Sequence, residues 1–383
     1  MATTLTVTAT HDYSNDLIDD ITDIVFNHSG FARATFSAVN FPIKVSNSVN
    51  ISGDTGDQDY LQVNLTVPGT FSASAWNVSN WTDQDGIVIL GSSGADTITG
   101  PSAAGGFVYL RGGAGADIVY GGNARNIFIF NAGDIKAGDS IFGGVGDDSI
   151  SPSMDGSTYD FRLVEMSSIR VLDVNAGVGN TSSTVILGGD QIGGASGIFN
   201  VFGSNGAWTS NVVVQGQTVD LSTVQFFSWT DGTDTLRLAG TKGADSLIGS
   251  IQSDTLFGGR GHDLFTGGDL NDVFDFNSIF DSLKGAKRDV ISDFNVGDNA
   301  AGGSFDDLID LKTIDANSLK AGNQAFHLIA STKFHHKAGE LMVKINSVND
   351  ITLIQGDTDG NGKADFQIEL TGQHSLSNLD FIL

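Results

Sequence analysis

Residues 238–276 read LAGTKGADS, LIGSIQSDT, LFGGRGHDL and FTGGDLNDV, followed by FDF. These are consecutive nine-residue units in which an apolar residue stands first, glycine third and aspartate eighth. Chance rarely keeps three residue classes in phase over four units. A fixed short period of this kind predicts a solenoid, in which each unit is one structural repeat that packs against its neighbours.

The residue types within the unit predict how it folds. A strand of about three residues around the apolar position points that side chain inward, and the glycine-rich remainder reverses the chain with positive φ. Two units then complete one turn of a flattened parallel coil, so that Asp245 lies beside Asp263 and Asp254 beside Asp272. Stacked carboxylates repel one another unless a cation lies between them, and oxygen-only ligands suit Ca²⁺.

An earlier block carries the same unit with insertions between its copies. Residues 89–98 fit one unit, and residues 110–119 and 141–150 fit the full pattern G-G-x-G-x-D-x-U-x, where U is apolar. We expect this decorated block to bind fewer ions. In the second block Gln252 and Ser253 occupy weak loop positions, so we expect the site of Asp254 to be looser. The candidate calcium-binding residues are Asp96, Asp117, Asp148, Gly112, Gly115, Gly143 and Gly146 in the first block and Asp245, Asp254, Asp263, Asp272, Gly258 and Gly261 in the second.

The two blocks belong to larger duplicated modules, because Trp-Thr-Asp precedes both Asp96 and Asp245 at similar distances. Apolar, β-branched and aromatic runs between turn-forming residues predict longer rungs of a parallel β-helix. Residues 15–26 alternatively fit one amphipathic helix that caps the solenoid end. The runs that predict rungs are 21–26, 169–174 and 224–229.

Composition excludes several classes of protein. The chain has 383 residues with 45 acidic and 19 basic side chains, a net charge of −26 that disfavours nucleic acid and anionic membranes as partners. Its 50 glycines and abundant aspartate disfavour helices, while 40% hydrophobic residues supply a core. There is no cysteine. The start lacks a Sec signal pattern and no apolar run approaches the ~20 residues of a membrane span, so we expect a soluble chain exported by another route.

A second acidic motif lies near the end of the chain. Residues 356–366 contain D-x-D-x-N-G, the start of an EF-hand loop, and offer Asp357, Asp359 and Asn361 as calcium ligands. Position twelve is Ile368 instead of glutamate, and strand-forming residues follow. The motif therefore fits either a calcium site or the solvated turn of a β-hairpin.

The nonapeptides resemble those of the RTX family of secreted calcium-binding proteins. Segments at 289–294, 307–311, 322–326, 339–341 and 380–383 look like the C-terminal domain that follows the β-roll in serralysin-type metalloproteases. The resemblance implies Ca²⁺ as the bound ion, a location outside the cell, and export by type I secretion machinery that reads an uncleaved C-terminal signal. H-E-x-x-H is absent, so the resemblance implies no protease activity.

No catalytic constellation stands out. Arg125, Arg162 and Arg170 are scattered, and the neighbours His335 and His336 would point to opposite faces of a strand, which favours a surface pair over a metal site. The tryptophans fit packing inside rungs better than binding of sugar; they are Trp76, Trp81, Trp208 and Trp229.

We therefore expect an all-β protein, a parallel β-roll or β-helix solenoid with calcium-binding turns and a mainly β C-terminal secretion domain. Its function would be non-enzymatic, in a surface layer, matrix or adhesive, with self-association or cell-surface polysaccharide as partners. The alternatives are a carbohydrate-active β-helix enzyme on an RTX export module, or a small ligand-binding N-terminal domain. The expected regions are 1–88 as solenoid start or cap, 89–150 as the first block, 151–237 as irregular rungs, 238–276 as the second block and 277–383 as the C-terminal domain with the secretion signal.

Overall fold

A computed structural model describes residues 3–41, 45–54, 56–102, 105–175, 182–206, 209–296 and 306–383. The chain forms two compact units, Met1–Ser183 with Ser196–Gly203 and Thr184–Ala195 with Ser204–Leu383. Each unit contains one of the two repeat blocks. The five regions expected from the sequence are finer than this division and stay predictions.

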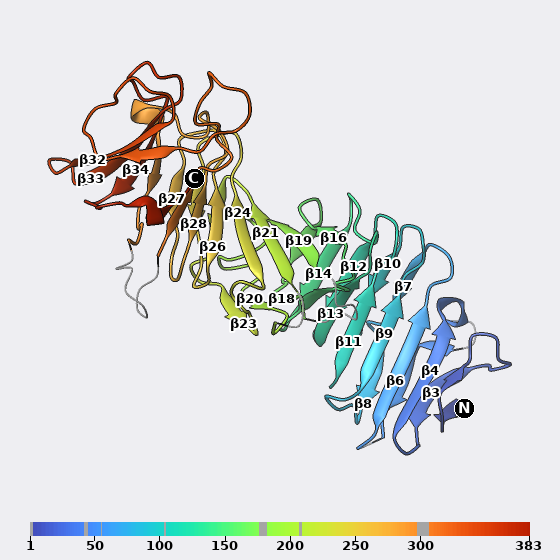
Figure 1. Cartoon of the computed structure of the whole chain (residues 1–383). Coiled ribbons are helices and arrows are strands. Elements are labelled where there is room, and N and C mark those ends of the chain that lie inside the picture. The colour runs from blue at the N-terminus through green and yellow to red at the C-terminus, as the bar shows by residue number, and fades with distance from the viewer. Residues whose placement is uncertain are drawn as a thin grey trace. The chain divides into compact units, whose positions relative to one another are not determined.

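In the first unit, parallel strands form three sheets, in the orders β1-β3-β5-β8, β7-β10-β12-β14-β17 and β2-β4-β6-β9-β11-β13-β15-β18-β20 (Figure 1). Its elements are β1 Thr3–Val7, β2 His11–Asp12, β3 Ile21–Phe26, β4 Phe31–Ser37, η1 Ala38–Asn40, β5 Val45–Ser52, β6 Gln58–Asn64, β7 Thr70–Ser72, β8 Asn77–Ser79, β9 Gly86–Leu90, β10 Thr97–Thr99, β11 Phe107–Arg111, β12 Ile118–Gly122, β13 Arg125–Phe130, β14 Ser140–Gly144, β15 Ser149–Pro152, β16 Thr158–Asp160, β17 Glu165–Ser167, β18 Val171–Asp173 and β20 Asn200–Phe202.

In the second unit, the sheets run β19-β21-β24-β26-β28-β30-β35 and β22-β25-β27-β29-β34-β33-β32-β31. The pairs β32–β33 and β33–β34 are antiparallel and form a meander. The remaining elements of the chain are β19 Ser183–Gly188, β21 Ser210–Gln215, β22 Thr218–Asp220, β23 Gln225–Phe227, β24 Thr235–Ala239, β25 Ser246–Ile248, β26 Asp254–Phe257, β27 Leu264–Thr266, β28 Val273–Asp275, η2 Gly285–Lys287, β29 Asp289–Ile291, β30 Leu308–Asp310, β31 His327–Ile329, β32 Glu340–Asn346, β33 Ile351–Asp357, β34 Phe366–Thr371, η3 Asn378–Asp380 and β35 Phe381–Ile382.

The core consists of stacked apolar side chains, one from each rung. In the second unit, Leu238, Leu256 and Phe274 lie in register on β24, β26 and β28, while Leu247 and Phe265 lie in register on β25 and β27. All five side chains are buried, and each such burial contributes about 1.5–3 kcal/mol. Alternate nine-residue units therefore belong to two sheets, which confirms that two units make one turn.

The first unit has the same construction with longer rungs. Phe36, Val63, Ile89, Leu110 and Phe128 form a continuous buried stack on β4, β6, β9, β11 and β13. Polar and apolar outward residues alternate with these inward ones, as expected for strands with one buried face. The parallel β-solenoid predicted from the repeats is thus the fold of this unit too.

The helix considered for residues 15–26 is wrong, and the strand interpretation is confirmed. β3 pairs in parallel with β1 and β5 and buries Ile21, Ile24 and Phe26. Its β-branched residues favour a pleated strand, where neighbouring strands satisfy the backbone. The other two runs contain β18 and β23.

The tryptophans of the described residues pack within the fold. Trp76 and Trp81 are 4% and 7% exposed, with their rings against Phe71 and Phe26. Trp229 packs against Phe226 at 5.2 Å, and Trp208 lies outside the described residues. No helix in the described part of the chain is long and apolar enough to cross a membrane.

Candidate metal centre

The loop aspartates of the second block lie in two rows, each along the end of one sheet. The backbone N–H of Asp245 donates to Oδ1 of Asp263 over 2.9 Å, and that of Asp254 donates to Oδ1 of Asp272 over 2.9 Å. Each carboxylate therefore accepts from the aspartate one turn earlier. The structure brings together the two pairs that the eighteen-residue spacing predicts.

Both rows continue beyond the repeats into residues that the site prediction missed. The N–H of Asp263 donates to Oδ1 of Asp289 over 2.8 Å, and that of Asp272 donates to Oδ1 of Asp307 over 3.0 Å. A signal was present in the sequence. Asp289 and Asp307, like the repeat aspartates, stand two residues before an inward apolar residue of a rung.

The second carboxylate oxygen divides the loops into two kinds. In loops with threonine or serine after the first glycine, the second carboxylate oxygen accepts a hydrogen bond from a backbone N–H of the same loop. Thr241 N–H donates to Oδ2 of Asp245 and Ser250 N–H to Oδ2 of Asp254, each over 2.6 Å. These carboxylates are satisfied by the protein alone. The loop of Asp96 is of the same kind.

In three of the loops that begin with two glycines, the second carboxylate oxygen is left without a hydrogen-bond partner. Oδ2 of Asp148, Asp263 and Asp272 is buried and has no hydrogen-bond partner. The second glycine of the two later loops has φ of +87° at Gly259 and +108° at Gly268, a conformation that residues with a Cβ rarely adopt. A buried carboxylate oxygen without a donor is costly and calls for another partner.

The leftover oxygens fall on adjacent turns. In one row, Oδ2 of Asp263 and Oδ2 of Asp289 are buried without a hydrogen-bond partner. In the other row, the same is true of Oδ2 of Asp272 and of Oδ1 of Asp306, the residue before Asp307. In the first unit the corresponding pair is Oδ2 of Asp148 and Oδ1 of Asn126, whose N–H donates to Asp148 over 2.8 Å. Sequence reasoning missed Asn126 because asparagine replaces aspartate there.

In the two double-glycine loops of the second block, the first glycine lies directly against the carboxylate five residues later. A Cβ added at Gly258 would lie 2.3 Å from Oδ2 of Asp263, and one at Gly267 would lie 2.3 Å from Oδ2 of Asp272. These separations are far below van der Waals contact. The fixed glycine–aspartate spacing therefore reflects a carboxylate held directly against bare backbone.

The first block distributes its aspartates over both sheet ends. Asp96 N–H donates to Asp117 and Asp117 N–H to Asp139, each over 2.8 Å, so these three share one row. Asp148 is in the other row with Asn126. The structure thus brings Asp96 and Asp117 together and separates Asp148 from them. Asp139 was missed.

Burial and neighbouring carboxylates make these groups reluctant to ionise. Burial, chiefly, and the neighbouring Asp245 raise the pKa of Asp263 to about 6. Burial, chiefly, and the neighbouring Asp263 raise the pKa of Asp289 to about 9. The pKa of Asp272 is raised to about 8 by burial and by Asp254. A cation between the turns would oppose both causes of the raised pKa values. Its positive charge would offset the repulsion between the carboxylates, and its coordination would replace the solvation that burial removes.

Calcium fits this donor set. The leftover atoms are carboxylate and amide oxygens, stacked in rows beside loop backbone, and Ca²⁺ takes six to eight oxygen ligands with flexible geometry. Asp263, Asp289, Asp272, Asp148 and Asn126 are the residues that would hold the ions. When bound, calcium would neutralise the paired charges and connect successive turns.

The acidic motif near the end of the chain forms the turn between β33 and β34. One oxygen each of Asp357, Asp359 and Asp365 lie within 4.8 Å of one another. Asp357 accepts from Gly360 N–H over 2.7 Å and from Gly362 N–H over 2.8 Å. The hairpin turn expected from the sequence is present, and calcium at Asp357, Asp359 and Asn361 stays a prediction.

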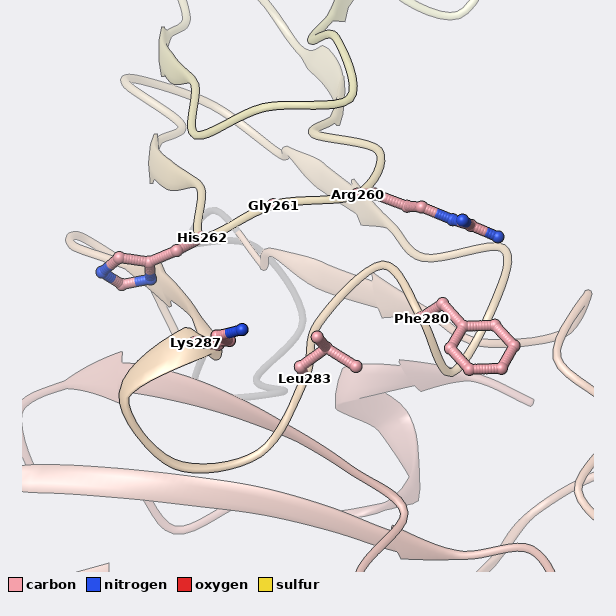
Figure 2. A pocket seen from close by; sticks show the side chains of 6 residues that line it. All are labelled: Arg260, Gly261, His262, Phe280, Leu283 and Lys287. Atoms are coloured by element: carbon pink, nitrogen blue, oxygen red, sulfur yellow. The ribbon is translucent and has the colours of Figure 1, made fainter.

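Three residues of the loop Gly258–Asp263, among them the candidate Gly261, line a cavity. Arg260 and His262 line a cavity of about 390 Å³ together with Phe280, Leu283 and Lys287 (Figure 2). Its lining residues include no carboxylate. His335 and His336 are both exposed, as expected for a surface pair.

The arrangement as a whole defines a calcium-binding β-roll protein. Residues 194–383 match the family described as peptidase M10 serralysin C terminal, and residues 104–134 and 137–152 match the RTX calcium-binding nonapeptide repeat. The chain thus carries RTX calcium-binding nonapeptide repeats and a serralysin-type C-terminal domain. Neither match is to a protease catalytic domain. Among curated proteins, none matches the chain.

Proposed function

We propose that this protein leaves the cell unfolded through type I secretion machinery, folds when extracellular calcium fills its loops, and then serves in a surface layer, matrix or adhesive without catalysing a reaction. The observation that carries the proposal is the set of buried, unpartnered oxygens on adjacent turns, such as Oδ2 of Asp263 and of Asp289. Without a cation these pairs oppose folding, and with one they favour it.

The free energy of calcium binding is large enough to switch the chain between unfolded and folded states. Weak extracellular calcium modules have Kd of about 10⁻⁴–10⁻³ M. At 1 mM calcium, a site with Kd of about 0.1 mM stabilises the folded chain by about 1.4 kcal/mol. Three such sites together contribute about 4 kcal/mol, comparable with the about 5–15 kcal/mol net stability of ordinary domains. Calcium binding then decides whether the chain is folded.

The matching families support the export part of the proposal. A chain held unfolded by its own carboxylate repulsion at low calcium would remain able to pass through the secretion machinery, and calcium outside the cell would favour the folded state. The net charge of −26 adds to the repulsion in the compact, metal-free state.

The test is a calcium titration of purified, EDTA-stripped protein, followed by far-UV circular dichroism and light scattering together. We expect a cooperative gain of β signal between submillimolar and millimolar calcium, followed by growth in scattering. Magnesium at the same concentration is the control, since it demands near-ideal octahedral geometry and keeps its waters. Full β structure in EDTA that calcium does not change would contradict the calcium switch.

A further inference from the structure

One sheet face of the first unit gathers arginine and aromatic side chains. It is formed by the outward side chains of β4, β6, β9, β11 and β13, which lie side by side (Figure 1). We call it the arginine–aromatic face. Its arginine and aromatic members include Phe31, Arg33, Tyr60, Phe107, Tyr109 and Arg125, all outside the buried stack.

This face carries no acidic side chain. On these five strands, the outward residues alternate with the buried ones. They include Arg33, Arg111 and Arg125, and none of them is Asp or Glu. The whole chain has 45 acidic residues against 19 basic ones. Arg111 forms an ion pair with Asp134 at 2.7 Å, so Arg33 and Arg125 supply the positive charge of the face. A positive patch on so acidic a chain is complementary in charge to a negatively charged partner.

The two arginines are held in place by aromatic rings. The guanidinium of Arg33 lies 5.3 Å from the ring centre of Tyr60 and 5.7 Å from that of Phe31. That of Arg125 lies 5.2 Å from the ring centre of Phe107. Arg33 donates to Gln62 over 3.2 Å, yet its buried Nε has no hydrogen-bond partner. Stacked guanidinium groups of this kind are ordered in advance for binding carboxylates.

The register places these groups in one row. Arg33 is opposite Tyr60, Gly86 follows on β9, and Phe107 and Arg125 complete the row on β11 and β13. A Cβ at Gly86 would lie 2.6 Å from the ring of Tyr60, so the ring rests on bare backbone. Aromatic and arginine enrichment with depletion of acidic residues and lysine is the composition of protein–protein interfaces.

We propose that the arginine–aromatic face binds the acidic surface of a second copy of this chain. The inference rests on the proposed assembly function and names the surface that assembly uses. Pairing of this face with itself would place the arginines of two copies against each other, so we take the acidic surface to lie elsewhere on the chain, which makes the contact heterologous. A heterologous contact that does not close into a ring generates open filaments, as a layer or matrix requires.

The test uses the full chain in saturating calcium. R33E/R125E reverses the charge of the face, while R162E makes the same kind of change at an exposed arginine that is ion-paired with Asp160. We expect both variants to show the wild-type calcium-induced circular dichroism. R162E should assemble like wild type in sedimentation velocity, and R33E/R125E should need at least a tenfold higher protein concentration for half-assembly.

The heterologous geometry gives a sharper readout. R33E/R125E keeps the acidic surface and loses the face, so a small fraction of it should terminate wild-type assemblies and shorten them. If reversal disturbs folding, R33Q/R125Q replaces it, with the same expected direction. The proposal is overturned if a folded variant assembles like wild type, or if folded wild type stays monomeric and binds an acidic polysaccharide through this face instead. Circular dichroism reports calcium folding separately, so failure of the face leaves the calcium switch standing.

Discussion

The backbone N–H of Asp263 donates a 2.8 Å hydrogen bond to Oδ1 of Asp289, and Oδ2 of each residue is buried without a partner. Asp263 belongs to the last double-glycine loop of its row, and Asp289 lies beyond the nine-residue repeats, at the start of β29. The row of aspartates therefore runs from the repeats into the chain that follows them. Folding of residues after the repeats and filling of the repeat loops should be coupled.

We predict opposite effects of D263N with and without calcium. Removing one of two opposed charges should increase β structure in EDTA, and loss of a ligand should raise the calcium midpoint roughly tenfold, equivalent to about 1.4 kcal/mol. Calcium titrations by circular dichroism measure both. D269N is the matched control, because Asp269 is an exposed carboxylate in a neighbouring loop. Equal shifts for the two variants would show that general charge, and not the paired oxygens, drives folding.

The loop glycines give a second prediction. G259A should destabilise the calcium-bound protein by about 1–3 kcal/mol, because Gly259 has φ of +87° and its Cβ would lie 2.4 Å from the carbonyl oxygen of Thr241. G243A, at a position without positive φ and with room for a Cβ, should cost little. Urea unfolding in saturating calcium compares them. Similar losses of stability in both would refute the assigned loop geometry.

The pH dependence of the free energy of unfolding should have opposite signs with and without calcium. Burial raises the pKa of Asp263 to about 6 and of Asp289 to about 9 in the metal-free fold. A raised pKa means that the fold prefers the protonated carboxyl, so in EDTA stability is highest at low pH and falls as pH rises from about 4 towards 9. With calcium, ligands must be deprotonated, and stability should rise over the same range. The β signal in circular dichroism across pH in EDTA, and denaturant unfolding across pH in calcium, test this; parallel pH profiles with and without calcium would contradict it.

The acidic hairpin turn gives a stoichiometric prediction. D359N should lower the number of calcium ions bound by one if Asp357, Asp359 and Asn361 hold calcium, as the D-x-D-x-N-G motif predicts. Equilibrium dialysis with atomic absorption measures the number. An unchanged number would identify the turn as one held by hydrogen bonds alone, such as those from Gly360 and Gly362 to Asp357.

Much of the fold was readable because one short period fixes it. The nine-residue spacing of Leu238, Leu247 and Leu256 predicted two sheets, parallel stacking and the pairing of Asp245 with Asp263. The helix alternative at 15–26 failed because its apolar spacing fits both periods, and pairing of β3 with β1 and β5 decided between them. Local periodicity contains no information about such pairing.

The site was only partly readable. Its sequence pattern marks aspartates in phase but does not distinguish Asp245, whose Oδ2 accepts from Thr241, from Asp263, whose Oδ2 is unpartnered. That difference depends on the backbone conformation of the residue after the first glycine, which has positive φ at Gly259 and Gly268. Asp289 was missed because its partner stands 26 residues earlier, beyond the repeat period. The arginine–aromatic face was invisible because its row joins five strands distant in sequence.

The central claim is that calcium occupies the unpartnered oxygens on adjacent turns. The most direct test is a crystal structure of calcium-loaded protein with an anomalous difference map at long wavelength. The account predicts peaks within coordinating distance of Oδ2 of Asp263 and of Oδ2 of Asp289, with others beside Asp272 and Asp148. Peaks confined to the loops of Asp245 and Asp254, or none beside these oxygens at saturating calcium, would contradict it.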